Sequence, residues 1–348
     1  MKKIGMYSPY FNILGGGERY LFTIAQCLSA MYQVDIFWKN PHILKDAERK
    51  FNLNLSKVSI RPWVQSTLTR TSQLREYDVF FYMTDGSLFF SPAKKNFLII
   101  QSSDKIPASS DFLNKLKLVS WSTLVCYSEF MVDQIQKKLA KKTTSLFVPV
   151  DLTSFKPGKK ENIILSVGRF FPYLHSKKYE ILIDAFKTMS KKNGSWKLHI
   201  AGSVDPGTEG YVRTLKKQAT GFPIIFHEGI SFVELKKLYS KATLYWHAAG
   251  FGEDPQVHPE RFEHFGVSTV EAMASGCVPI SYNGGGQPEI VSSESGFLWN
   301  TPEELINQTQ SLISNKKMVN DYGQKALQRA QNYSVELFCS KIYEMVET

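Results

Sequence analysis

Two glutamates in the C-terminal half, Glu263 and Glu271, are separated by seven residues, and a Phe-Gly pair lies between them. Glu271 is expected within a short helix that begins near Val267 and ends at Gly276, because glycine commonly terminates helices. Glu263 precedes this helix, so the two carboxylates cannot share one helix face. They can instead flank the helix N-terminus, where open amide groups and the helix dipole favour phosphate. Such carboxylates would hydrogen-bond the sugar and ribose hydroxyls of a bound diphosphate compound.

A second candidate lies near the start of the chain, where Gly15-Gly16-Gly17-Glu18 separates an apolar run from a helical pattern. Glycines at such a position let the backbone approach a ligand closely, since they carry no Cβ. A dinucleotide fingerprint does not fit, because no glycine lies three residues after Gly17. An ordinary tight turn between strand and helix remains an alternative interpretation.

Alternating apolar runs and helical patterns are the elements that would position these residues. In the first half, strands are expected near 3–8, 33–38, 78–82, 96–101 and 124–127, with helices at 18–30 and 129–138. In the second half, strands are expected near 162–167, 197–201, 224–227, 244–247 and 278–282. The last helical pattern, about 302–346, is expected to break near Ser334. A linker rich in proline and small polar residues lies at 148–158.

This organisation predicts two α/β domains, 1–150 and 151–348, each a doubly wound parallel sheet, with ligands bound at the carboxyl ends of strands. The final helix, about 334–348, is expected to pack back on the N-terminal domain. Residues 1–150 contain 20 Lys and Arg against 11 Asp and Glu, so nearly all of the net charge of +10 lies there. A basic half of the chain is suited to bind an anionic membrane surface, an anionic acceptor or nucleic acid. The alternative is that its Lys and Arg residues only form a solvated surface.

The cysteines and the hydropathy of the chain indicate the cellular compartment in which it is expected to function. The four cysteines, Cys27, Cys126, Cys277 and Cys339, lie far apart without CxxC spacing. We therefore expect neither a disulfide framework nor a zinc site, and a cytoplasmic location. No apolar run approaches the roughly 18–20 residues of a membrane-spanning helix.

The segment around the second glutamate, Glu271-Ala-Met-Ala-Ser-Gly-Cys-Val-Pro279, together with the Phe-Gly pair after Glu263, resembles glycosyltransferase family 4 of the retaining GT-B type, the glycosyl transferases group 1. Leu165-Ser-Val-Gly-Arg-Phe170 is similar to the segment that opens the second domain in that family. Gly15–Glu18 resembles its Gly-Gly-x-Glu turn, and 283–290 its Gly-Gly-x-x-Glu loop. The resemblance covers nearly the whole chain. It implies a GT-B fold, in which two Rossmann-like domains face each other across a cleft.

The resemblance also implies roles for individual residues. Arg169 and Lys177, with Lys178 as the alternative, would hold the donor diphosphate, since fixed cations stabilise a leaving group that gains negative charge. Glu263 would bind sugar hydroxyls and Glu271 the ribose. The implied catalytic residues are Glu263, Arg169 and Lys177, and the implied donor-binding residues are Gly16, Gly17, Arg169, Lys177, Ile230, Phe265, Gly266, Val267 and Glu271. Trp246 and His247 are interpreted as packing at a strand end.

The implied activity is hexose transfer from a UDP- or GDP-sugar to a glycan, polysaccharide or lipid-linked acceptor, with retention and without a metal or other cofactor. The Glu-His-Phe-Gly run resembles that of some mannosyltransferases, which favours mannose as the transferred sugar. Many relatives carry a histidine near the reacting sugar in the first domain, where this chain has Gln101 and Ser102 instead. The basic first half is the acceptor side in the family, so docking on an anionic inner membrane face is expected.

Three other functions are alternatives. A sugar-nucleotide epimerase can share the architecture and would need no acceptor. A phosphorylase that uses pyridoxal phosphate is longer and needs a cofactor lysine. Nucleic-acid binding through the basic half is disfavoured, because the basic residues are scattered and no recognised motif is present.

Overall fold

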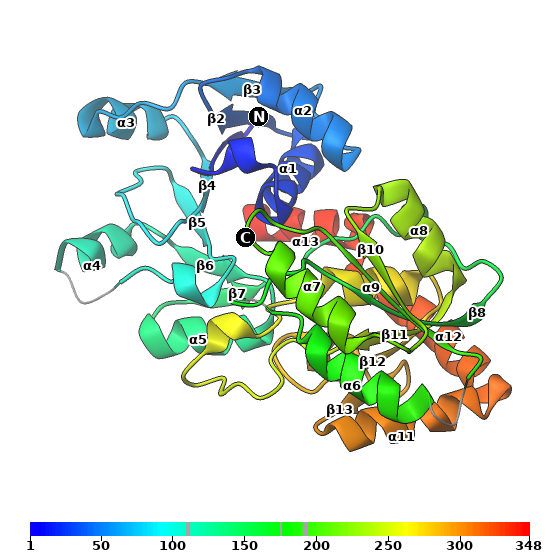
Figure 1. Cartoon of the computed structure of the whole chain (residues 1–348). Helices are drawn as coiled ribbons and strands as arrows, with labels where there is room; N and C mark the ends of the chain where they lie inside the picture. Colours follow the sequence, from blue (N-terminus) through cyan, green and yellow to red (C-terminus); the bar gives the residue numbers. More distant parts are fainter. Residues whose placement is uncertain (109–111, 175, 191–193) are drawn as a thin grey trace. The chain divides into compact units, whose positions relative to one another are not determined.

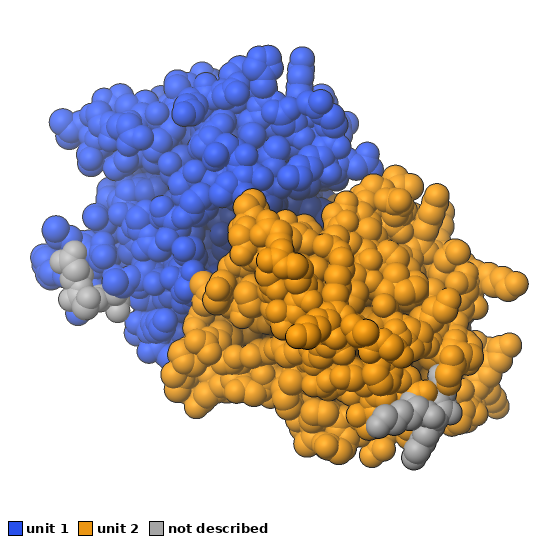
Figure 2. All heavy atoms as spheres, in the orientation of Figure 1, with its two compact units in different colours: residues 1–149, 336–348 blue, residues 150–335 orange. Residues whose placement is uncertain are grey.

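The computed structural model describes residues 1–108, 112–174, 176–190 and 194–348. The chain forms two compact units, which Figure 2 shows in different colours. Unit 1 comprises residues 1–149 and 336–348, and unit 2 comprises residues 150–335. Each unit is built from strands that alternate with helices (Figure 1).

Unit 1 contains a seven-stranded parallel sheet with the strand order β3-β2-β1-β4-β5-β6-β7. Its strands are β1 Lys3–Tyr7, β2 Gln33–Phe37, β3 Val58–Arg61, β4 Val79–Met83, β5 Lys95–Ile99, β6 Thr123–Cys126 and β7 Thr143–Ser145. Its helices are α1 Gly16–Ser29, α2 His42–Phe51, α3 Thr67–Leu74, α4 Phe112–Val119, α5 Glu129–Lys138 and most of α13 Val335–Glu347. Every residue of β4 is buried, as expected for a parallel strand that is covered on both faces.

Unit 2 contains a six-stranded parallel sheet with the order β10-β9-β8-β11-β12-β13. Its strands are β8 Glu161–Val167, β9 Lys197–Gly202, β10 Ile224–Glu228, β11 Ala242–His247, β12 Val278–Tyr282 and β13 Phe297–Trp299. Its helices are α6 Tyr179–Ser190, α7 Glu209–Gln218, α8 Phe232–Lys241, α9 Val267–Ala274, α10 Gln287–Ile290, α11 Pro302–Ile313 and α12 Lys316–Ala330. A buried cluster that includes Trp246 and Trp299 joins this sheet to its helices.

The order of strands reverses across the sheet of unit 2 between β8 and β11, which are neighbours although β9 and β10 lie between them in the chain. Connections leave the carboxyl ends of these two strands towards opposite sides, and this opens a crevice in doubly wound sheets. Val167 and His247 are the last residues of β8 and β11. Side chains that follow them are therefore placed at the binding end of unit 2.

The expected α/β fold class and the expected strands are confirmed, with ends that shift by one or two residues. The expected long helix at 302–346 is interrupted twice. Ser334 follows a 3₁₀ turn at the expected break, but a second break at Ser314 and Asn315 was missed. The Asn315 side chain accepts a hydrogen bond from the Met318 amide at 3.0 Å and so begins α12.

The expectation that no disulfide forms is wrong. Cys27 in α1 and Cys339 in α13 are bonded, with Cα atoms 5.2 Å apart although 312 positions separate them in the chain. Spacing along the chain could not reveal this pair, because only the folding of α13 against α1 brings the two cysteines together. The same two helices share a contact between the rings of Tyr20 and Phe338, whose centroids are 5.3 Å apart.

Helix length also bears on membrane topology. In the described part of the chain, no helix combines the length and the apolar character that a bilayer crossing requires.

Candidate active site

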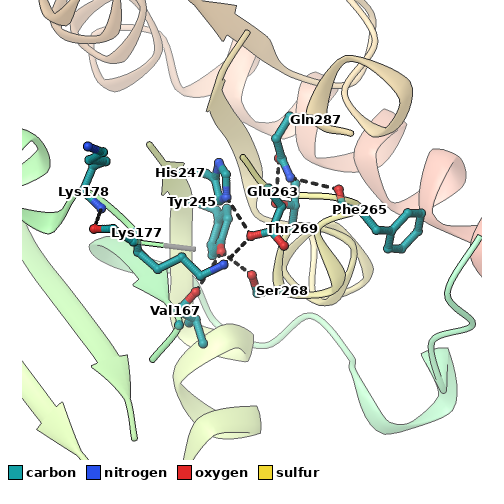
Figure 3. Close-up of polar contacts among 12 residues, drawn as sticks. Val167, Lys177, Lys178, Tyr245, His247, Glu263, Phe265, Ser268, Thr269 and Gln287 are labelled. Atoms are coloured by element: carbon teal, nitrogen blue, oxygen red, sulfur yellow. Dashed lines mark hydrogen bonds and ion pairs between the residues drawn. The ribbon is translucent and has the colours of Figure 1, made fainter. Parts of the chain in front are cut away.

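The centre of the candidate site is a group of three side chains in unit 2, shown in Figure 3. The Lys177 ammonium donates to the Glu263 carboxylate, and the two side chains are 17% and 19% exposed. His247 Nε2 lies 3.2 Å from the same carboxylate oxygen, Glu263 Oε2. His247 ends β11, and Lys177 lies between β8 and α6, so the reversal point of the sheet brings the group together.

Electrostatics fix the charge states in this group. Burial by itself would raise the pKa of Glu263, but the Lys177 ammonium and the hydrogen bonds from His247 and Lys177 hold it well below its usual range. Burial lowers the pKa of His247, and this effect outweighs the opposing attraction to Glu263. At neutral pH Glu263 is therefore ionised and His247 is a neutral imidazole that donates from Nε2. The buried Nδ1 of His247 has no hydrogen-bond partner among the described residues.

Gly168 allows Lys177 to reach Glu263. A Cβ on Gly168 would lie 2.6 Å from Cε of Lys177, so the lysine chain passes directly over the glycine backbone. The next residue, Lys178, has a left-handed backbone with φ of +52°. This turn sends the two adjacent lysines to different acids, and Lys178 Nζ contacts Glu253 Oε1 at 2.6 Å.

The long segment 249–262 is anchored by Glu253, whose side chain is 12% exposed. The second carboxylate oxygen of Glu253 accepts from Arg261 Nη1 at 2.8 Å. Glu253 lies near the start of the segment and Arg261 near its end, so this carboxylate connects both ends of the segment with Lys178. Burial would raise the pKa of Glu253, but the hydrogen bonds from Lys178 and Arg261 lower it overall. The ionised Glu253 thus holds the segment that leads into Glu263.

The glycine-rich loop 284–286 supports the backbone that carries Glu263. The Gly286 amide donates to the Glu263 carbonyl at 2.8 Å. A Cβ on Gly285, whose φ is +61°, would lie 2.2 Å from that carbonyl oxygen. Only glycine fits such a close approach of two backbones, particularly in the left-handed region. This loop therefore packs on the site through its backbone.

Helix α9 begins directly after Glu263 and Phe265. Its N-cap, Gly266, has φ of +121°, and the first intrahelical bond runs from the Thr269 amide to the Gly266 carbonyl. The amides of Val267 and Ser268 precede that bond and are the open donors of the helix. Gln287 fixes this end of α9, since its side chain donates to the Phe265 carbonyl at 3.2 Å and accepts from Thr269 at 2.9 Å.

Glu271 lies one turn further along α9 and is 7% exposed. Its Oε2 accepts a hydrogen bond from the Tyr239 hydroxyl at 2.9 Å. Burial and the neighbouring Glu271 charge raise the pKa of Tyr239, so this hydroxyl stays protonated and donates. The two glutamates thus occupy different environments, one beside a lysine and the other beside a tyrosine.

Arg169 and Ile230 are not part of the Lys177–Glu263–His247 group. The Arg169 side chain is 56% exposed, and its Nη1 lies 3.4 Å from Asp205 Oδ2. It follows Val167 and Gly168 at the carboxyl end of β8, so it lies at the binding end of the sheet and turns towards Asp205. Ile230 is half-buried in the turn between β10 and α8.

Gly16 and Gly17 lie in unit 1, where they are the first residues of α1. The Glu18 carboxylate accepts from the Gly15 amide at 2.8 Å and closes this helix end. A Cβ on Gly17 would lie 2.2 Å from Oε1 of Gln101, so the Gln101 side chain rests against the glycine. Gln101, which lies where many relatives carry a histidine, therefore borders the glycine turn.

Sequence reasoning missed His247 and Glu253 as neighbours of the charged group. His247 was interpreted as packing at a strand end, although its position at the end of a strand could have placed it at the binding edge. No signal in the sequence joins Glu253 to Lys178, because that contact spans 75 positions. In the part of the chain that the structure describes, no three His, Cys, Asp or Glu side chains are grouped to hold a metal ion.

This arrangement can bind a negatively charged ligand and order its hydroxyls. The open amides of α9 and the ammonium of Lys177 attract phosphate oxygens. Glu263 is held ionised beside them and accepts hydrogen bonds from hydroxyl groups. Its orientation is fixed by Lys177 and His247, so it requires little rearrangement when a ligand binds.

Comparison with known proteins adds a family and several relatives. The profile of the family Glycosyl transferases group 1 matches residues 151–329. A GDP-Man:Man(3)GlcNAc(2)-PP-Dol alpha-1,2-mannosyltransferase of Xenopus tropicalis is 31% identical over 185 residues, which cover 48% of this chain and 35% of that protein. A GDP-mannose-dependent alpha-(1-6)-phosphatidylinositol dimannoside mannosyltransferase of Mycobacterium tuberculosis is 25% identical, over 59% of this chain and 52% of that protein. The matches thus span about half or less of these relatives.

The fold is similar to that of solved glycosyltransferases along its whole length. A structure of Anabaena Alr3699/HepE in complex with UDP aligns over 100% of both chains, with a TM-score of 0.75 and 17% identity. A glycosyltransferase from Rickettsia africae aligns over 99% of this chain and 97% of its own, with a TM-score of 0.73 and 14% identity. At these identities the likeness concerns the fold, which is the expected GT-B architecture of two Rossmann-like domains.

Proposed function

Because the chain belongs to the family Glycosyl transferases group 1, we propose that it transfers a hexose from a nucleotide-diphosphate sugar to an acceptor hydroxyl, with retention of configuration and without a metal. The observation that carries this proposal is the contact of Lys177 and His247 with Glu263 at the N-terminus of α9. A cation, an ionised acid and open helix amides at the reversal point of the sheet suit a sugar diphosphate.

In the proposed reaction, the bond between the sugar C1 and the diphosphate oxygen breaks while the acceptor oxygen bonds to C1 on the same face. The acceptor proton passes to a phosphate oxygen of the leaving nucleotide, so no protein base is needed. Lys177 and the α9 amides would stabilise the negative charge that develops on the diphosphate. Glu263 would hold the sugar hydroxyls.

Several further residues would complete donor binding. Glu271 would accept hydrogen bonds from the ribose hydroxyls, with Tyr239 holding its other side. Arg169 would turn from Asp205 to the diphosphate, because its exposed side chain can rotate and its present pair, 3.4 Å long, is weak at the surface. Ile230, Phe265, Gly266 and Val267 would contribute mostly backbone contacts, and Gly16 and Gly17 would approach the donor or acceptor from unit 1.

The substrates that we propose come from the named relatives. Those are GDP-mannose-dependent enzymes whose names specify a dolichol-linked or phosphatidylinositol-linked acceptor. We propose GDP-mannose as donor and a glycan or lipid-linked acceptor, used at a membrane face. The positive charge of residues 1–150 supports an acceptor that is anionic or lies at an anionic surface.

Titration calorimetry of the full chain with GDP, UDP and their sugars tests this proposal. Glu271→Gln should weaken binding of the preferred nucleotide by about 10- to 150-fold, since a charge-assisted hydrogen bond to the ribose is lost while Tyr239 keeps a partner. Glu263→Gln should leave nucleotide affinity within about twofold and lower turnover.

Exposed Glu303 at the start of α11 provides the matched control, and Glu303→Gln should change neither quantity. Unchanged nucleotide affinity in Glu271→Gln would contradict the ribose role. Release of an isomerised sugar nucleotide in the absence of any acceptor would replace the transferase proposal with an epimerase.

A further inference from the structure

Helix α4 in unit 1, Phe112–Val119, presents large apolar side chains to solvent. Phe112 is 71% exposed, Leu113 59%, Leu116 50% and Val119 73%. None of the residues of this helix is buried. Figure 1 shows α4 at the outer edge of unit 1. A surface helix normally turns such residues towards the core, so the orientation of α4 is the reverse of the usual one.

Contacts on the opposite side hold α4 in this orientation. Leu118 packs against the buried cluster of unit 1, and the Trp121 amide donates to its carbonyl at 3.1 Å. Lys141 Nζ donates to the carbonyls of Leu118 at 2.7 Å and Val119 at 3.3 Å. The Leu118 packing and the Lys141 bonds thus hold the C-terminal end of α4 against unit 1 while its apolar side faces outward.

Charge is placed beside the exposed apolar stripe. Phe112, Leu116 and Val119 follow a spacing of four and three residues, so they lie along one side of the helix. At 100° per residue, Leu113 lies about 60° from Leu116 and widens this apolar side. Lys115 and Lys117 then lie on its two flanks, each about 40° beyond the nearest apolar residue, Val119 and Leu113 respectively. An apolar stripe between lysines is the pattern of a helix that lies in the interface of a membrane.

We propose that α4 docks on the surface of an anionic phospholipid bilayer. Phe112, Leu116 and Val119 would enter the boundary between headgroups and acyl chains, and Lys115 and Lys117 would pair with lipid phosphates. The excess of Lys and Arg in residues 1–150 would add long-range attraction to the same surface. This inference deepens the acceptor side of the proposed function, on which its biological meaning rests, although docking itself requires no nucleotide sugar.

A second copy of the chain fits this surface less well than lipid does. A helix of eight residues is about 12 Å long, too short to supply the roughly 800 Å² per partner of a stable interface. Two copies would also bring the same lysines together, and like charges oppose that contact. Anionic lipid complements both the apolar stripe and its flanking charges.

Flotation of the full chain with vesicles tests the proposal, and vesicles of phosphatidylcholine alone are compared with vesicles that contain phosphatidylglycerol. The wild type should bind the anionic vesicles, and Phe112→Gln with Val119→Gln should lower the partition coefficient by about tenfold or more, because apolar burial is lost. Met31, which is 60% exposed and follows α1, gives the matched control, and Met31→Gln should bind like the wild type.

The lysines are tested separately at low salt. Lys115→Gln with Lys117→Gln should weaken binding by about tenfold or more, and Lys45→Gln with Lys50→Gln on exposed positions of α2 should weaken it less. If the two double variants lost vesicle binding equally, the vesicles would be attracted by the positive charge of unit 1 in general, and docking by α4 would be overturned.

A fluorescent label reports insertion directly. Cys126 and Cys277 are buried and Cys27 and Cys339 are bonded, so Val119→Cys offers the reactive thiol for an environment-sensitive dye. The dye should shift to the blue on anionic vesicles, whereas a dye on Met31→Cys should not. No shift at Val119, or a concentration-dependent dimer that Val119→Gln abolishes, would refute the proposal. Parallel titration with GDP-mannose separates this failure from failure of the transferase proposal.

Discussion

At the scale of residues, the charge state of Glu263 is the property on which the site depends. Lys177 and His247 contact the same carboxylate, and together they overcome the effect of burial on its pKa. A buried carboxylate with one cation and one neutral donor is stable only while that cation is present. Arg169 is in a different position, because its ion pair with Asp205 is exposed and contributes little.

Lys177→Met should reverse the pH dependence that Glu263 contributes to stability. In the wild type, the depressed pKa gives stability that is present above the unfolded value near 4.5 and is lost as pH falls below it. Without the ammonium, burial should raise the pKa above the unfolded value, so the variant should lose stability as pH rises from about 5 to about 8. We expect a loss of about 3–5 kcal/mol near neutral pH, measured by urea unfolding.

Two variants check this expectation. Glu263→Gln in the Lys177→Met background should abolish the added pH dependence, because no carboxylate remains to titrate. Lys217→Met, at an exposed position of α7, should leave a difference from the wild type that does not vary with pH. A Lys177→Met variant that follows the wild-type pH curve would show that the ion pair does not control Glu263.

At the scale of elements, the site depends on backbones that touch. The loop 284–286 lies against the segment that carries Glu263, and Gln287 fixes the N-terminus of α9. Gly168 gives Lys177 its path in the same way. These glycines are needed because another chain segment occupies the space of a Cβ, and β8, β11 and β12 bring those segments together.

Gly285→Ala should displace the Glu263 backbone. Its Cβ would lie 2.2 Å from the Glu263 carbonyl oxygen, in addition to the strain of a φ of +61°. We expect a loss of about 2–4 kcal/mol in the free energy of unfolding, together with weakened nucleotide binding. Gly229→Ala is the matched control for stability and should cost only about 1 kcal/mol. Gly229 has a φ of +62°, and none of the described residues comes within 4 Å of the place that its Cβ would take. Equal losses would mean that the contact with Glu263 is unimportant.

At the scale of the whole molecule, the chain crosses from one unit to the other and returns. Residues 336–348 leave unit 2 and complete unit 1, where α13 packs on α1. The disulfide between Cys27 and Cys339 fixes this return, and Lys2 pairs with Glu347 at 2.9 Å near the end of the helix. Unit 1 is therefore closed by a segment that is synthesised after unit 2.

Reduction of the disulfide should destabilise unit 1. The bond closes a loop of most of the chain, and its loss should lower the free energy of unfolding by about 2–4 kcal/mol, measured by urea unfolding with and without dithiothreitol. Cys27→Ala with Cys339→Ala should reproduce that loss and respond no further to dithiothreitol. Two free thiols at these positions in the oxidised protein, detected by mass spectrometry after alkylation, would contradict the prediction.

Although it did not indicate β3, β7 or β13, the sequence by itself determined the α/β fold, the central strands of both sheets and the short helix that carries Glu271. These follow from local patterns, since apolar runs, helical periodicity and terminal glycines act over a few residues. The motif around Glu263 and Glu271 also indicated the family that the profile confirms. Local pattern likewise placed Lys177 between a strand and a helix, where a side chain can reach the binding edge.

Only the tertiary structure decided which partners those residues have. It joined Lys177 to Glu263 across 86 positions, turned Arg169 towards Asp205 and brought His247 to the carboxylate. It also paired Cys27 with Cys339 and turned the apolar side of α4 outward. These outcomes depend on contacts between segments far apart in the chain, which local periodicity and spacing do not encode.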